Sequence, residues 1–176
     1  MKAFAVEFYK NGKLLRNKIK NHPRYPYHLL REEMQEFILD KLQLLIERKL
    51  IKGIGENGTE YTVIAQLLDL PKEILRLIQK FDFTKKNPKL IYINTGETMI
   101  SLQDSILVTF LNLAGFDILF FVPTGYQSVE NYFAEKLMEE HQIGEYKYDM
   151  QVPDLNSLSL NSTRHTWRDK IFKRGN

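Results

Sequence analysis

The sequence predicts an α/β fold with a parallel, Rossmann-like sheet and flanking helices, preceded by an N-terminal hairpin and a long amphipathic helix. Two short apolar runs, 89–94 and 117–122, have the nearly continuous hydrophobicity of strands that helices cover on both faces. Residues 100–114 between them are apolar except for a narrow, uncharged polar line, which is typical of a buried helix. A strand, a helix and a second strand in this order form a βαβ unit with parallel strands.

The elements before this unit follow from turn residues and helical spacing. Residues 3–9 read as a strand and lead into Asn11-Gly12, the dipeptide best suited to a two-residue turn, so an N-terminal hairpin is predicted. From 28 to 52, apolar residues recur every three or four positions until Gly53 supplies a stop. This spacing predicts the long amphipathic helix.

Shorter elements have weaker patterns. Residues 61–68 fit either a short strand or a helix. Asp69 fits the cap of a following helix, with Pro71 in its first turn. After the second apolar run, the spacing over 128–142 predicts a helix, and 146–152 a further strand.

Length and composition limit the organisation of the chain. With 176 residues, the chain fits one compact unit, made of a hairpin and helical region (1–86) and a Rossmann-like α/β region (87–176). No segment approaches the roughly 20 apolar residues of a membrane-spanning helix, and the N-terminus lacks signal-peptide features. The chain has no cysteine, which fits a reducing compartment, so a cytoplasmic location without a membrane partner is predicted.

The net charge of +3 conceals a basic N-terminal stretch. No acidic residue lies between Glu7 and Glu32, and the end of this basic run mixes cations with aromatic rings at Arg24, Tyr25, Tyr27, His28 and Arg31. Cations mixed with aromatic rings suit contacts with phosphate or single-stranded nucleic acid. The alternative is a solvated segment whose tyrosines pack on the core. Strong nucleic-acid binders have a far larger basic excess, so we favour the alternative and do not expect a nucleic-acid partner.

Polar loops follow both strands of the predicted βαβ unit. In open α/β sheets, ligands bind outside the carboxyl ends of the strands, where a helix N-terminus offers unpaired N–H groups to an anion. We therefore predict a binding site for a phosphorylated small molecule. Backbone N–H groups would hold the anion, a glutamate would orient hydroxyls or a cation, and a tyrosine would stack on a ring. The predicted ligand-binding residues are Thr95, Gly96, Glu97, Thr98, Thr124, Gly125, Tyr126 and Gln127.

Turn chemistry is the alternative explanation of the first loop. Thr98 or Ser101 fits the N-cap of the following helix, Gly96 permits the bend, and Ser101 with Asp104 resembles a capping box. The loop is neither a Walker loop nor G-x-G-x-x-G. The four histidines lack the paired spacing of metal ligands, and no Ser/His/Asp signature is present. No metal site is predicted, and catalytic residues and any cofactor stay unassigned.

The string Asn94-Thr-Gly-Glu-Thr98, the stretch 115–126 and the Val129-Glu130 pair are similar to the C-terminal part of the YceG-type stress-operon family. That family is described as a component of a biosynthetic module beside tellurium-resistance proteins. The resemblance implies a role near stress and tellurium resistance, and synthesis of a nucleoside-like metabolite. Family members are usually much longer, so it also implies a fragment of a longer protein or a truncated member.

Two functions follow as hypotheses, with nucleic-acid binding through the basic N-terminal stretch as a weaker third, and whether the chain is an enzyme stays open. In the first, an α/β domain of a biosynthetic enzyme or enzyme-like protein binds a phosphorylated or nucleotide-like metabolite at the strand-end loops. A missing N-terminal half would then supply the other wall of the site. In the second, the chain is a non-catalytic interaction module of a stress-response complex. It would dock on a protein partner through the helix at 29–51 and the two cationic ends of the chain, the N-terminal basic stretch and a second one at 164–174.

Overall fold

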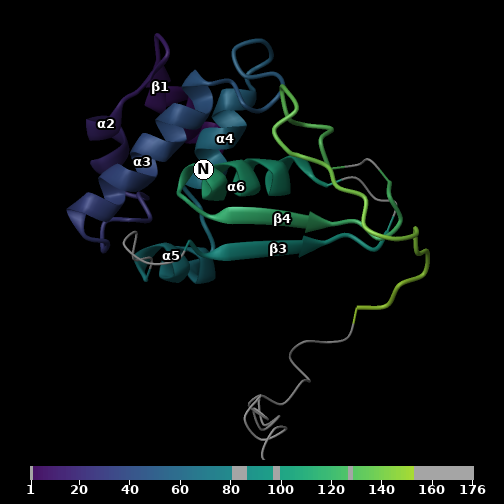
Figure 1. The fold of residues 1–176 in the computed structure, drawn as a ribbon. Coiled ribbons are helices and arrows are strands. Elements are labelled where there is room, and N and C mark those ends of the chain that lie inside the picture. Colours follow the sequence, from purple (N-terminus) through teal and green to yellow (C-terminus); the bar gives the residue numbers. More distant parts are fainter. Residues whose placement is uncertain (1, 81–86, 97–99, 127–128, 153–176) are drawn as a thin grey trace, which may run out of the picture.

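The computed structural model describes residues 2–80, 87–96, 100–126 and 129–152. Helices dominate the N-terminal part, and a pair of parallel strands lies in the later part (Figure 1). The described elements are α1 (Lys2–Ala5), the 3-10 helix η1 (Val6–Phe8), β1 (Tyr9–Lys10), β2 (Lys13–Leu14), α2 (Arg16–Lys20), α3 (Glu32–Glu47), α4 (Thr59–Leu67), α5 (Lys72–Gln79), β3 (Lys89–Ile93), α6 (Leu102–Leu113) and β4 (Asp117–Phe121). None of the described helices is both long and apolar enough to cross a membrane.

The N-terminal hairpin is present but short. β1 and β2 pair in antiparallel fashion, and the turn residues Asn11 and Gly12 both have positive φ, as predicted. The strand predicted over 3–9 is wrong for most of its length, because α1 and η1 precede the hairpin. Ala5 and Phe8 are both buried in the core. Their spacing of three is helical, and a short apolar run alone does not distinguish this spacing from that of a strand.

The long amphipathic helix is α3, which is shorter than predicted. It ends before Gly53 because Lys49 adopts the left-handed conformation, with φ 51°. The Leu50 N–H donates to the Leu45 carbonyl at 3.4 Å, and the Lys49 N–H donates to the Ile46 carbonyl at 3.1 Å. These are the two hydrogen bonds of a Schellman C-cap, so a lysine does here what glycine usually does. The fully buried side chains of α3 include Ile38, Leu39, Leu42 and Leu45.

The segment that fitted either a strand or a helix is helical. Residues 61–68 lie in and just after α4, whose N-cap is Gly58 at φ 82°. The next helix, α5, begins after Pro71, close to the predicted start. The N-cap of α5 is Pro71 and not Asp69, and this N-cap makes no side-chain hydrogen bond.

The βαβ unit is confirmed. β3 and β4 pair in parallel, with Lys89 opposite Asp117 and Ile93 opposite Phe121, and α6 connects them. α6 contacts β4 on one side and α3 and α4 on the other, and so ties the strand pair to the helical part of the chain (Figure 1). The described residues form only two small sheets of two strands each, so the Rossmann-like topology stays a prediction.

The expectation that helices cover both faces of these strands is wrong for the described residues. In both strands, exposed positions alternate with partly buried ones. The partly buried side chains Leu90, Ile118 and Phe120 pack against the core. The opposite face carries large apolar side chains that remain exposed. One layer of helix therefore covers one face of this sheet.

The segment after β4 does not form the predicted helix. The described residues 129–152 contain turns and an isolated antiparallel bridge between Phe133 and Ile51. Beside this bridge, the Ala134 N–H donates to the Leu50 carbonyl at 3.0 Å. The apolar spacing at the start of the segment reflects genuine burial, but backbone hydrogen bonds to the loop after α3 replace helical ones.

Candidate functional site

The carboxyl ends of β3 and β4 lie side by side, as the predicted site requires. The Asn94 N–H, directly after β3, donates to the carbonyl of Phe121 at the end of β4, at 3.0 Å. The two following loops therefore start at the same edge of the sheet. The structure describes five of the predicted site residues, namely Thr95, Gly96, Thr124, Gly125 and Tyr126, whereas Glu97, Thr98 and Gln127 lie outside the described residues.

The first loop uses its own groups to form a turn. The Gly96 N–H donates to Asn94 Oδ1 at 3.3 Å, the local hydrogen bond by which asparagine side chains stabilise turns. Thr95 is half-buried and Gly96 is exposed. An anion bound to the Gly96 N–H would therefore compete with the Asn94 side chain.

The second loop is also internally hydrogen-bonded. The Gly125 N–H donates to the Val122 carbonyl at 3.0 Å, and the Tyr126 N–H lies 3.4 Å from Thr124 Oγ1. Thr124 is buried, whereas the Tyr126 side chain is exposed. Among the described residues of this loop, 122–126, only the tyrosine thus presents a large side-chain surface to a ligand.

A tyrosine that sequence reasoning did not assign to the site packs on the second loop. A Cβ atom at Gly125 would lie 2.1 Å from Cε1 of Tyr146, and Gly125 has φ 66°, so this position requires glycine. The Lys147 N–H donates to the Pro123 carbonyl at 2.9 Å and holds the segment in place. The strand predicted over 146–152 is absent. No local pattern could reveal this contact, because it joins residues far apart in the sequence.

The N-terminus of α6 is capped by its own residues. Ser101 Oγ accepts a hydrogen bond from the Asp104 N–H at 3.0 Å and donates to Asp104 Oδ2 at 2.6 Å. The turn-chemistry explanation is therefore correct for Ser101. Burial raises the pKa of the nearby Tyr92 hydroxyl, and the negative charge of Asp104 raises it further. Tyr92 and Asp104 are polar groups at this edge that the sequence reasoning did not select.

The charge of this edge limits the chemistry that it supports. The described loop residues 94–96, 100–101 and 122–126 contain no lysine or arginine. The Asp104 carboxylate lies in the first turn of α6, where it already complements the positive end of the helix dipole. Hydroxyl groups and an aromatic ring are therefore better complements to this edge than a phosphate alone.

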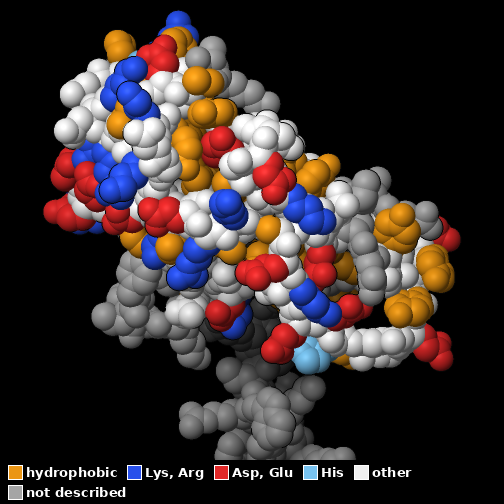
Figure 2. Space-filling view, turned by 90° about the horizontal axis from the view of Figure 1, so that it is seen from above, with side chains coloured by type: hydrophobic (Ala, Val, Ile, Leu, Met, Phe, Trp, Pro, Cys, Tyr) orange, Lys and Arg blue, Asp and Glu red, His pale blue; other side chains and the backbone are white. Residues whose placement is uncertain are grey.

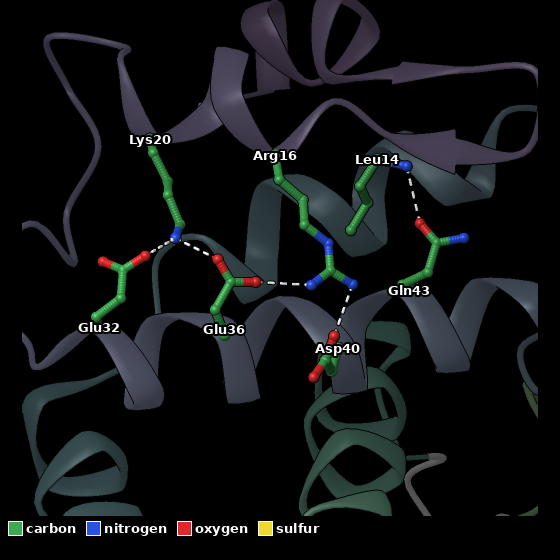
Figure 3. A network of polar contacts seen from close by, with 7 residues as sticks. All are labelled: Leu14, Arg16, Lys20, Glu32, Glu36, Asp40 and Gln43. Atoms are coloured by element: carbon green, nitrogen blue, oxygen red, sulfur yellow. Dashed lines mark hydrogen bonds and ion pairs between the residues drawn. The ribbon is translucent and has the colours of Figure 1, made fainter.

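Two cations of the basic N-terminal segment, Arg16 and Lys20, are engaged with α3. Arg16 binds Glu36 and Asp40 at 2.7 Å and 2.6 Å, and Lys20 binds Glu32 and Glu36. These acidic residues follow one another at spacings of four along one side of α3 (Figure 3). Figure 2 shows the same mixture of blue and red side chains at the end of the molecule formed by α2 and α3. The charges of Arg16 and Lys20 are thus neutralised within the chain.

The tyrosines of the basic segment pack on the core, as the alternative explanation predicted. Tyr25 and Tyr27 are both buried, with their rings edge to face at 5.6 Å between centroids. Buried rings are not available for base stacking.

The ion-pair network gives a testable pH dependence. Hydrogen bonds from Lys20 and then Arg16 hold the pKa of Glu36 below its ordinary value. A carboxyl group with a lowered pKa contributes stability above its unfolded pKa and loses it as pH falls through its folded pKa. We expect Glu36→Gln to lower the free energy of unfolding by about 1 kcal/mol at neutral pH and by much less in acid.

Urea unfolding at neutral and acidic pH measures this difference. Glu56→Gln, which removes an exposed glutamate outside the network, serves as the matched control and should be nearly neutral at both pH values. An equal loss for Glu36→Gln at both pH values would show that the carboxylate charge does not contribute.

Comparisons of the sequence with known proteins identify a family. The YceG domain model matches residues 1–159. A curated relative from Bacillus subtilis (strain 168), named "Uncharacterized protein YceG", is 31% identical over 93 residues, which are 51% of this chain and 17% of that relative. The match thus covers only a small part of the length of this relative. No solved structure matches the chain. Because the family model covers most of its length, this chain belongs to the YceG family.

Proposed function

We propose that this chain is a component of a biosynthetic module associated with stress and tellurium resistance, and that it binds a phosphorylated or nucleotide-like metabolite. The ligand site is the carboxyl edge of β3 and β4, within a Rossmann-like sheet. The observation that supports this position is the in-register parallel pair, connected by α6. In open α/β sheets this edge is where ligands bind.

The groups at this edge favour the nucleoside part of such a ligand. Tyr126 presents an exposed ring on the second loop, and aromatic rings stack on bases of any sequence. Thr95 and Asp104 offer a hydroxyl and a carboxylate that suit sugar hydroxyls. A phosphate would have to compete for the Gly96 N–H with the Asn94 side chain, so the nucleoside part is expected to contribute most of the affinity.

Thermal unfolding of the purified chain against nucleosides, nucleotides and sugar phosphates tests the proposal. A ligand that binds only the folded state at a concentration of 100 times its Kd adds about 2.7 kcal/mol of stability. For a chain of this size, that corresponds to a rise in Tm of about 5 to 10 °C. We expect a nucleotide to give a larger rise than ribose 5-phosphate.

Two glycine variants locate the binding site. Gly125→Ala places a methyl group against the Tyr146 ring, and we expect it to abolish the ligand-induced rise in Tm. Gly144→Ala is the control, because Gly144 also has a left-handed φ, of 78°, but has open space around the added methyl group. Each variant is compared with its own ligand-free Tm. Absence of a rise with every ligand, or an equal rise in both variants, would contradict the proposed site.

The alternative function, a non-catalytic interaction module, would have to dock on its partner through a surface other than α3. The apolar side of that helix, including Leu42 and Leu45, is fully buried in the core of the chain itself. It is therefore not available to a partner while the chain is folded.

A further inference from the structure

The face of the β3–β4 sheet that points away from the core carries a block of exposed apolar side chains. We call this surface the open sheet face, and it consists of Ile91, Ile93, Leu119 and Phe121, which are 59%, 39%, 57% and 46% exposed. The parallel register places Ile91 opposite Leu119 and Ile93 opposite Phe121. The four side chains therefore form one contiguous patch and not scattered surface residues.

The open sheet face is electrically neutral along its described length. Lys89 and Asp117 alternate with the patch residues and so lie on the same face, at the start of the two strands. They form an exposed ion pair at 2.9 Å. This ion pair carries no net charge, so the patch does not favour a strongly charged partner.

Parallel strands are normally covered on both faces, because their connections place helices there. Here α6 lies against one face only. Contiguous apolar patches with a polar border mark interaction surfaces in folded proteins. An amphipathic helix, which would cover this face as α6 covers the other, is the matching element.

We propose that the open sheet face is the docking surface for an amphipathic helix from a part of a YceG-family polypeptide outside these 176 residues. The matched residues make up only 17% of the Bacillus subtilis relative, so that relative contains long segments outside the matched stretch. The apolar stripe of such a helix would pack on Ile91 and Leu119, with its polar side toward solvent. This interaction does not depend on the proposed metabolite site.

The test uses overlapping synthetic peptides that cover the part of the Bacillus subtilis relative outside the matched stretch. Each peptide is labelled, and its binding to the full chain is followed by fluorescence anisotropy. We expect at least one peptide to bind, to become helical on binding, and to lose at least tenfold in affinity with Ile91→Lys and Leu119→Lys. Both replaced side chains are exposed, so both variants are expected to keep the fold, which circular dichroism verifies.

Leu29→Lys is the matched control, since Leu29 is an exposed leucine outside the patch, and it should bind the same peptide with unchanged affinity. Failure of every peptide to bind, or equal binding to all variants, would overturn the proposal. Analytical ultracentrifugation tests the other possible occupant of the face, which is a second copy of this chain. A wild-type dimer that Leu119→Lys dissociates would show that a second copy of this chain, and not a helix from elsewhere, covers the face.

Discussion

Replacing Leu42 by alanine is expected to lower the free energy of unfolding by about 3 kcal/mol, because large-to-small changes in a packed core remove apolar burial and leave a cavity. Leu42 lies in the middle of α3, and its side chain is fully buried among core residues. For a chain of this size the loss corresponds to a fall in Tm of about 6 to 12 °C. Urea unfolding followed by far-UV circular dichroism measures it.

This prediction separates the two roles that the sequence allowed for the helix. A docking helix would tolerate the change in the isolated chain, and only partner binding would suffer. If α3 is a core helix, the substitution lowers the stability of the isolated chain, with no partner present. Leu29→Ala is the control, because this exposed leucine contributes little and its removal should change stability by less than about 0.5 kcal/mol. Similar small effects at both positions would contradict the burial of α3.

The βαβ unit could be predicted because its signals are local. Two short apolar runs flank a helix-length segment, and β3, α6 and β4 lie within a residue or two of the predicted ranges. The hairpin turn was equally clear, since Asn11 and Gly12 both adopt the positive φ that the turn requires. In each case the sequence pattern and the tertiary contacts favour the same conformation.

The errors arise where distant contacts override a local pattern. Residues 129–142 have helical spacing, yet Phe133 pairs with Ile51 and the chain stays non-helical. The continuous hydrophobicity of residues 89–94 and 117–122 correctly predicted the strands β3 and β4. It could not show that one face of this strand pair would lack a cover among the described residues.

The candidate site likewise combines features that local sequence signals predict with features that depend on distant contacts. The position of both loops followed from the parallel strand order, and the Asn94–Phe121 hydrogen bond confirms that they start together. The packing of Tyr146 on Gly125 depends on how a distant segment returns to the sheet. Sequence patterns therefore predicted the edge of the sheet, but not the groups that border it.

Tyr27→Phe is expected to lower the free energy of unfolding by about 2 kcal/mol, because it leaves two buried backbone groups without their partner. The Tyr27 hydroxyl donates to the Leu67 carbonyl at 2.6 Å and accepts from the Leu70 N–H at 3.0 Å. It thereby joins the end of α4 to the segment that leads into α5. Burial raises the pKa of this hydroxyl, so it keeps its proton and remains a donor at neutral pH.

Tyr25→Phe is the matched control for this prediction. Tyr25 is also buried, but within the described part of the chain its hydroxyl has no hydrogen-bond partner. Burial raises the pKa of Tyr25 to about 12, so this hydroxyl too is neutral and is desolvated without compensation. Its removal should leave stability unchanged or increase it by up to about 1 kcal/mol. Differential scanning calorimetry of both variants measures the contrast. Equal destabilisation would mean that ring packing, and not the Leu67 and Leu70 hydrogen bonds, determines the contribution of Tyr27.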